Sequence, residues 1–189
     1  MKTLAFAAAL ALSTTATYAA DTYTLESSHS QVVFSYNHLG FSTTHGMFAG
    51  FEGEISFDEA DPAASSVSVS MPVKSMFTGW EQRDSHFMSA DFFGVEDGDM
   101  ITFTSTGIEV TGDDTAKITG DLSMNDVTKS VVLDAKLNKA DTHPMENKAW
   151  LGFDASTTLL RSDFGLGAFA PAIGDEVEVM ISVEAQKAE

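Results

Sequence analysis

Two short clusters that mix charged and aromatic residues are the first places to look for chemistry. One reads RSDFGLG, from Arg161 to Gly167, and the other reads RDSHFMSADFF, from Arg83 to Phe93. A reaction centre needs an acid, a base and a nucleophile that meet. Serines are abundant, but no G-x-S-x-G elbow occurs and nothing marks a third partner for either cluster. We therefore predict that the protein is not an enzyme.

The two arginines allow two further interpretations. A guanidinium group at the rim of a pocket can hold a phosphate or a carboxylate through two parallel hydrogen bonds. Alternatively, Arg161 pairs with Asp163 and Arg83 pairs with Asp84, because charged side chains tolerate burial when they are paired. We favour the structural interpretation, in which these pairs fasten a short helix to one end of the fold.

On the structural interpretation, RSDFGLG forms a plug. Its two glycines permit a turn, Phe164 and Leu166 pack inward, and Arg161 and Asp163 fix the two ends. The DFG triplet inside it is not a kinase motif, because the partner motifs of a kinase are missing.

Histidines are potential metal ligands, and five of them occur: His29, His38, His45, His86 and His143. A zinc site needs three or four ligands in a tetrahedral array. His29, His45 and His86 meet only if they share one mouth of the fold, and the chain has no cysteine and no H-x-x-x-H pair. We expect His29 and His38 to hydrogen-bond within the first hairpin. The sequence therefore predicts no metal site and no other cofactor.

The N-terminus has the features of a secretory signal peptide. Lys2 supplies positive charge, Leu4 to Leu12 is apolar, and the small residues Thr17 and Ala19 precede a cleavage site. The apolar run is too short to span a bilayer, which needs ~20 residues. We predict a cleaved signal peptide at residues 1–20 and one mature domain at residues 21–189, located in the periplasm.

Composition excludes several partners. The chain carries 28 acidic and 10 basic residues, a net charge of -18. A nucleic-acid partner is excluded, because phosphate binding needs a basic face. No later segment is apolar and long enough for a membrane span. The absence of cysteine excludes disulfides and thiolate chemistry.

Strict alternation of apolar and polar residues predicts an all-β protein. The segments 32–38, 47–58, 65–73 and 176–186 each place apolar side chains on one face, which is typical of antiparallel strands with one wet side. Further strands are expected at 22–27, 100–111, 115–123, 128–138 and 149–160. About eight to ten strands without a βαβ rhythm favour a closed antiparallel barrel, and a two-sheet sandwich is the alternative.

One segment departs from this alternation. In TGWEQRDSHFMSADFF, Thr78 is a predicted helix N-cap and Glu81 follows three residues later. We expect a short helix here that covers one mouth of the barrel.

Five motifs occur in a recognisable order: YTLESSHSQVVFSYNHLGFSTTHGMFAGFEGEISFD, RDSHFMSADFF, ITFTST, ITGDLSMNDVTKSVVL and RSDFGLG. With them, residues 22–186 resemble the YceI-like family of exported proteins. The resemblance implies a lipocalin-like β-barrel of about eight strands that takes up a long apolar chain, and it implies no known catalysis. The turn at Met124, Asn125 and Asp126 departs from the family pattern, as does the HPMENKAW loop.

The resemblance and the composition together predict a binding protein for an amphiphilic lipid, namely a polyisoprenoid, a quinone or a fatty-acid derivative. Fourteen phenylalanines and nine methionines suit an adaptable apolar lining. The predicted lining and lid residues are Val32, Phe34, Tyr36, Phe51, Ile55, Phe57, Phe87, Phe92, Phe93, Phe103, Leu122, Phe153, Val177, Val179 and Ile181. Candidates for holding the polar head group are His29, Arg83 and Arg161.

An alternative is an envelope stress or interaction protein, with a solid barrel and an acidic working surface. In that case apolar side chains fill the interior and no ligand binds. The sequence also leaves open whether two barrels pair as a homodimer.

Overall fold

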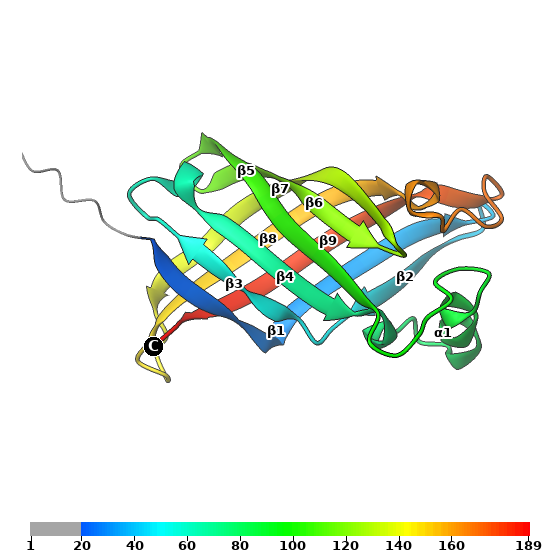
Figure 1. Cartoon of the computed structure of the whole chain (residues 1–189), viewed down its shortest axis with the longest axis horizontal. Helices are drawn as coiled ribbons and strands as arrows, with labels where there is room; N and C mark the ends of the chain where they lie inside the picture. The colour runs from blue at the N-terminus through cyan, green and yellow to red at the C-terminus, as the bar shows by residue number, and fades with distance from the viewer. Residues whose placement is uncertain (1–19) are drawn as a thin grey trace, which may run out of the picture.

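Strands make up most of residues 20–189, the part of the chain that the computed structural model describes (Figure 1). The strands are β1 Asp21–His38, β2 Ser42–Phe48, β3 Glu52–Phe57, β4 Ser66–Pro72, β5 Met100–Gly112, β6 Thr115–Met124, β7 Val127–Thr142, β8 Ala149–Leu160 and β9 Ile173–Lys187. The α-helix α1 is Glu81–Met88, and the 3-10 turns are η1 Pro62–Ala64, η2 Val73–Ser75 and η3 Arg161–Phe164. Residues 1–19 of the predicted signal peptide lie outside the described residues.

The sheet closes on itself. Neighbouring strands pair antiparallel in the order β1-β3-β4-β5-β6-β7-β8-β9, and β9 pairs with β1 to complete the ring. The additional strand β2 pairs with the second half of β1 outside this ring. The prediction of an antiparallel barrel of about eight strands is therefore confirmed, and the sandwich alternative is wrong.

Strand β1 bends sharply at a bulge between Glu26 and Gln31, so that segments expected as two strands form one. The Glu26 carboxylate holds this bend. It accepts hydrogen bonds from the hydroxyl and backbone N–H of Ser28 and from the backbone and ring of His29. These bonds, the Ser28 hydroxyl foremost, lower the pKa of Glu26 to about 2.

The prediction of a single strand at 47–58 is wrong, because the chain breaks there into β2 and β3. Gly50 takes a left-handed conformation with φ of 70° between the two strands. The break shifts the alternation, so Phe48 and Phe51 both face the interior. Met47 was expected on the inner face but is not among the residues that line the cavity, and its backbone forms a bridge with Phe77.

The short helix exists, but its predicted cap is wrong. Trp80 is the N-cap of α1 and makes no side-chain cap bond. The backbone N–H and the hydroxyl of Thr78 donate instead to the carboxylate of Asp84, inside the helix. Gly79, with φ of 80°, turns the chain between Thr78 and the helix.

Candidate ligand-binding cavity

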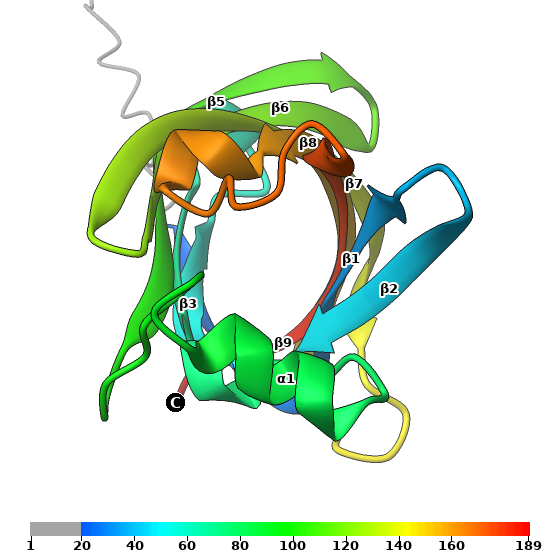
Figure 2. The same ribbon diagram turned by 90° about the vertical axis from the view of Figure 1, so that its right-hand side faces the viewer.

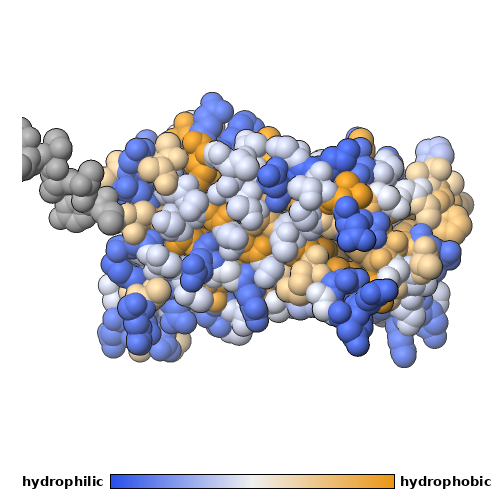
Figure 3. All heavy atoms as spheres, viewed as in Figure 1, coloured by the Kyte–Doolittle hydropathy of each residue, from blue (hydrophilic) through white to orange (hydrophobic). Residues whose placement is uncertain are grey.

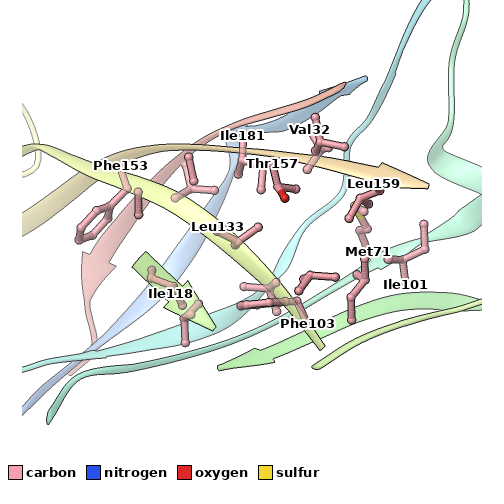
Figure 4. Close-up of a pocket in the computed structure, with 18 of the residues that line it drawn as sticks. Val32, Met71, Ile101, Phe103, Ile118, Leu133, Phe153, Thr157, Leu159 and Ile181 are labelled. Atoms are coloured by element: carbon pink, nitrogen blue, oxygen red, sulfur yellow. The ribbon is translucent and has the colours of Figure 1, made fainter. Parts of the chain in front are cut away.

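An apolar cavity of about 360 Å³ runs along the inside of the barrel. All nine strands contribute to its wall, which reaches from η1 and the β5–β6 turn at one end to α1 and η3 at the other. Figure 4 shows side chains from β1 and from β4 through β9 converging on it, with the Thr157 hydroxyl among aliphatic and aromatic groups. An engineered apolar cavity of about 150 Å³ already stays dry and binds benzene.

The inner side chains are less covered than those of a filled core. Leu133, Leu137 and Val179 face the cavity and are only partly buried, whereas Leu151 keeps 1% of its surface exposed. Side chains in a close-packed interior leave few voids larger than a water molecule. The interior is therefore hollow, and the solid barrel considered as an alternative does not fit this structure.

The wall contains every residue that the sequence predicted for it. These are Val32, Phe34, Tyr36, Phe51, Ile55, Phe57, Phe87, Phe92, Phe93, Phe103, Leu122, Phe153, Val177, Val179 and Ile181. Whether they contact a ligand stays a prediction.

Sequence reasoning missed the contribution of β7. Val131, Leu133, Ala135 and Leu137 also line the cavity, at every second position of the strand. The same period of two that identified the other strands was available here to find them.

Helix α1 lies across part of one open end of the barrel (Figure 2). Phe87 packs against Tyr36 of β1, with ring centroids 6.2 Å apart, and against Phe92, at 5.0 Å. Phe92 in turn contacts Phe169, from the segment between η3 and β9, at 6.1 Å. Aromatic rings thus link α1 to the opposite side of this mouth.

Arg161 lies in the cavity wall near this mouth and forms hydrogen bonds with backbone carbonyl groups. Its guanidinium group donates hydrogen bonds to the carbonyl oxygens of Leu166, Ala168, Ile173 and Gly174. Four of its five N–H groups are used in this way. Burial lowers the pKa of Arg161, so these carbonyl contacts and the charge of Asp175 must compensate for lost hydration.

The expected pairing of Arg161 with Asp163 is wrong. Asp163 is exposed, and its carboxylate lies 4.0 Å from Lys129 Nζ. Asp175 is the carboxylate whose charge acts on Arg161, and it accepts hydrogen bonds from the backbone and hydroxyl of Ser162. The plug itself is as expected, because Phe164 and Leu166 are buried.

Arg83 also donates a hydrogen bond to a backbone carbonyl group, and it lies outside the cavity wall. It donates to the hydroxyl and the carbonyl oxygen of Thr78, and its guanidinium carbon lies 5.8 Å from the ring centre of Trp80. Asp84 accepts from Thr78, so the expected direct pair with Arg83 is replaced by a shared partner.

His29 lies at the β1 bulge, where its ring Nδ1 is 2.7 Å from Glu26. It borders a second hollow with His143, Trp150 and Glu184, and it is not among the residues of the cavity wall. The hypothetical meeting of His29, His45 and His86 does not occur. Within residues 20–189, no group of three histidine or acidic side chains is arranged to hold a metal ion.

Comparison with known proteins assigns the chain to a family. A sequence profile of the YceI-like domain matches residues 23–185. The chain belongs to the YceI-like family. A UPF0312 protein of Ectopseudomonas mendocina is 41% identical over 156 residues, which cover 82% of this chain and 81% of that protein. Protein YceI of Escherichia coli is 40% identical over 159 residues, covering 84% and 82%.

Solved structures share the fold. Burkholderia cenocepacia BcnA superposes with a TM-score of 0.76 at 21% identity, covering 85% of this chain and 98% of BcnA. The Campylobacter jejuni YceI protein gives 0.72 at 29% identity, covering 81% and 90%. A domain from Saccharophagus degradans, described as a polyisoprenoid binding domain, gives 0.68 at 13% identity, covering 88% and 98%.

The turn between β6 and β7 gives this YceI-like chain a specific contact. Asn125 and Asp126 both have positive φ, which suits a tight hairpin turn. The Asn125 side-chain amide donates to the carbonyl oxygen of Phe164, at 2.8 Å. The departure from the family pattern seen in the sequence thus fastens the plug to a neighbouring hairpin.

The helices of residues 20–189 were also compared with what a bilayer crossing requires. None of them combines sufficient length with sufficient hydropathy.

Proposed function

We propose that this protein is an exported carrier that holds one long-chain amphiphilic lipid in its barrel. The candidates are a polyisoprenoid, a quinone or a fatty-acid derivative. The observation that carries the proposal is the hollow apolar interior of about 360 Å³. Membership in the YceI-like family supports it, as does the fold shared with a domain described as polyisoprenoid-binding.

Burial of an apolar tail supplies the binding energy. Each CH₂ group moved out of water contributes roughly 0.8 kcal/mol. A ten-carbon tail therefore gains roughly 8 kcal/mol before the costs of ordering and association are subtracted. Binding of this kind needs no chemical step, which is why we propose binding and not catalysis.

Export to the periplasm is part of the proposal. It rests on the signal-peptide features of residues 1–20, and it agrees with where the barrel begins. Asp21 already pairs with Phe57 of β3, directly after the predicted cleavage site. N-terminal sequencing of protein from a periplasmic fraction tests this, with Ala20 or Asp21 expected as the first residue.

Extraction of freshly purified protein with organic solvent, followed by mass spectrometry, tests the carrier function. We expect one long-chain lipid per barrel. A protein that yields no lipid and that takes up none of these lipid classes in solution contradicts the proposal. Light scattering of the same sample reports whether a homodimer forms, which stays a prediction.

Two tryptophan variants one residue apart test whether the lipid lies inside. Ala155 lines the cavity and Ser156 faces outward on β8. Ala155→Trp places an indole in the lumen and is expected to prevent lipid retention, whereas Ser156→Trp retains it. Equal retention by both folded variants places the lipid elsewhere.

A further inference from the structure

The exposed large aromatic side chains of this protein collect at one end of the barrel. In residues 20–189 there are four: Phe41 with 90% of its surface exposed, Phe77 with 60%, Trp80 with 58% and Phe169 with 57%. Phe41 lies in the β1–β2 turn, Phe77 and Trp80 precede α1, and Phe169 lies between η3 and β9. These elements all surround the α1 end (Figures 1 and 2).

Leu39, in the same β1–β2 turn, is 48% exposed and extends this aromatic rim. Apolar residues gather at the right-hand end in Figure 3, over the β1–β2 turn and the segment between η3 and β9. The exposed apolar side chains farther along the barrel, such as Val132, Met145 and Met180, are aliphatic and lie on separate strands or turns. A gathered apolar patch marks an interaction site, whereas scattered residues need no explanation.

Phe169 connects the rim to the cavity. Phe169 is exposed and contacts Phe92, and Phe92 lines the cavity. The rim consists of Leu39, Phe41, Phe77, Trp80 and Phe169. None of these five residues is part of the cavity wall. An apolar chain that entered between them would reach the lumen along aromatic surface and would not cross open water.

Charge decides which apolar partner fits. Trp and Phe side chains suit the boundary between lipid head groups and acyl chains. An anionic lipid surface is repelled, because the protein carries a net charge of -18 and Glu81, Asp91 and Glu96 are exposed around α1. The cationic Arg83 is occupied by Thr78 and Trp80.

We propose that the rim formed by Leu39, Phe41, Phe77, Trp80 and Phe169 docks the open end of the barrel onto a zwitterionic lipid surface. Docking brings the cavity mouth to the membrane so that a lipid tail passes between them without hydration. This proposal rests on the lipid-carrier function, and it adds the surface from which the lipid is loaded or to which it is delivered.

Flotation with vesicles of phosphatidylcholine tests the docking, using full-length mature protein. The variant is Phe41→Ser, and the matched control is Met145→Ser, which is 79% exposed in the β7–β8 turn at the other end. We expect Phe41→Ser to bind vesicles about ten-fold more weakly, because one phenyl group leaves the lipid boundary. Met145→Ser is expected to bind like the wild type.

Fluorescence gives a second readout. The chain has two tryptophans, so a Trp150→Phe variant reports on Trp80 alone. Vesicles of phosphatidylcholine are expected to shift its emission to shorter wavelength, and phosphatidylglycerol added to the vesicles is expected to reduce the effect.

Three results overturn the docking proposal: no binding of the wild type to phosphatidylcholine, binding only to anionic vesicles, or a rim that instead pairs two copies of the chain. In those cases the carrier function is still supported if lipid can be extracted from the purified protein and if Phe41→Ser takes up lipid normally in solution. Vesicle binding without any lipid inside the barrel contradicts the carrier function and not the docking.

Discussion

The two ends of the barrel are built differently, although one apolar wall joins them. At the α1 end a helix, a buried plug and an arginine bound to four carbonyl groups surround the mouth. The other end consists of strand turns and η1, and the exposed residues Asp113 and Asp114 border the cavity there. A helix and a buried plug therefore border the α1 end, whereas strand turns and η1 form the other end.

We expect the contrast in charge between the two ends to orient a bound amphiphile. Arg161 places a cation in the wall near α1, and one of its N–H groups is not used by the four carbonyl bonds. Asp113 and Asp114 repel an anion at the opposite end. An amphiphile with a carboxylate or phosphate head is expected to bind with its head toward α1.

The largest effect is expected from the plug. Phe164→Ala removes a side chain that is 1% exposed and should lower the free energy of unfolding by about 4 kcal/mol, as other buried phenylalanines do. Urea denaturation measures this. Phe41→Ala, at a position that is 90% exposed in the β1–β2 turn of the same end, is the control and should change stability by less than about 0.5 kcal/mol. Equal effects would mean that the plug does not organise this end.

Arg161→Leu is expected to lower the free energy of unfolding by about 3 kcal/mol, because several carbonyl groups lose a charged donor. Arg161→Lys keeps the charge without the planar set of donors and should be intermediate. Stability and lipid affinity are measured on the same samples. Unchanged stability with weakened lipid binding would show that Arg161 holds the head group and not the loop.

Acid should weaken the α1 end through Asp175. Its hydrogen bonds from Ser162, assisted by Arg161, lower its pKa, so its stabilisation is present above the ordinary aspartate pKa. The stabilisation is lost as the pH falls below that value through the lowered pKa.

Asp175→Asn should therefore cost about 1 kcal/mol near pH 7 and less near pH 3, measured by urea denaturation. Asp163→Asn, with its carboxylate 4.0 Å from Lys129, is the matched control. A pH-independent difference between wild type and Asp175→Asn contradicts this assignment.

The smallest effect is expected at the other end. Lys187 pairs with Asp21 between the first and last strands, and both side chains are well exposed. Solvent and salt screen such a pair. Lys187→Met should leave the thermal midpoint unchanged within error, and a clear drop would mean that this end also depends on side-chain contacts.

The alternation of side chains predicted the strands of the barrel and twelve residues of its wall, whereas the lid residues Phe87, Phe92 and Phe93 came from the segment that departs from alternation. A strand in a closed sheet has one dry and one wet face, so each inner residue is recognisable within its own strand. The same rule failed at 47–58, because a single left-handed residue at Gly50 changes which residues face inward. A break of this kind leaves little trace in a pattern of hydrophobic and polar residues.

Partners of polar side chains were predicted less well. Arg161 and Arg83 were expected to pair with the nearest aspartates in sequence, yet both bind backbone carbonyl groups. His29 was a candidate for holding the head group, but it lies at the β1 bulge beside Glu26 and outside the cavity wall. The hydrogen-bond acceptors within reach of a long side chain depend on which segments the fold brings close to it, and the sequence alone does not show this.

The sequence by itself determined which residues of the regular strands face inward, since that property depends on a local period of two. Only the tertiary structure decided that the interior is hollow. The free volume depends on how eight strands close and on how far side chains from opposite walls reach, and no segment of the chain contains that information alone.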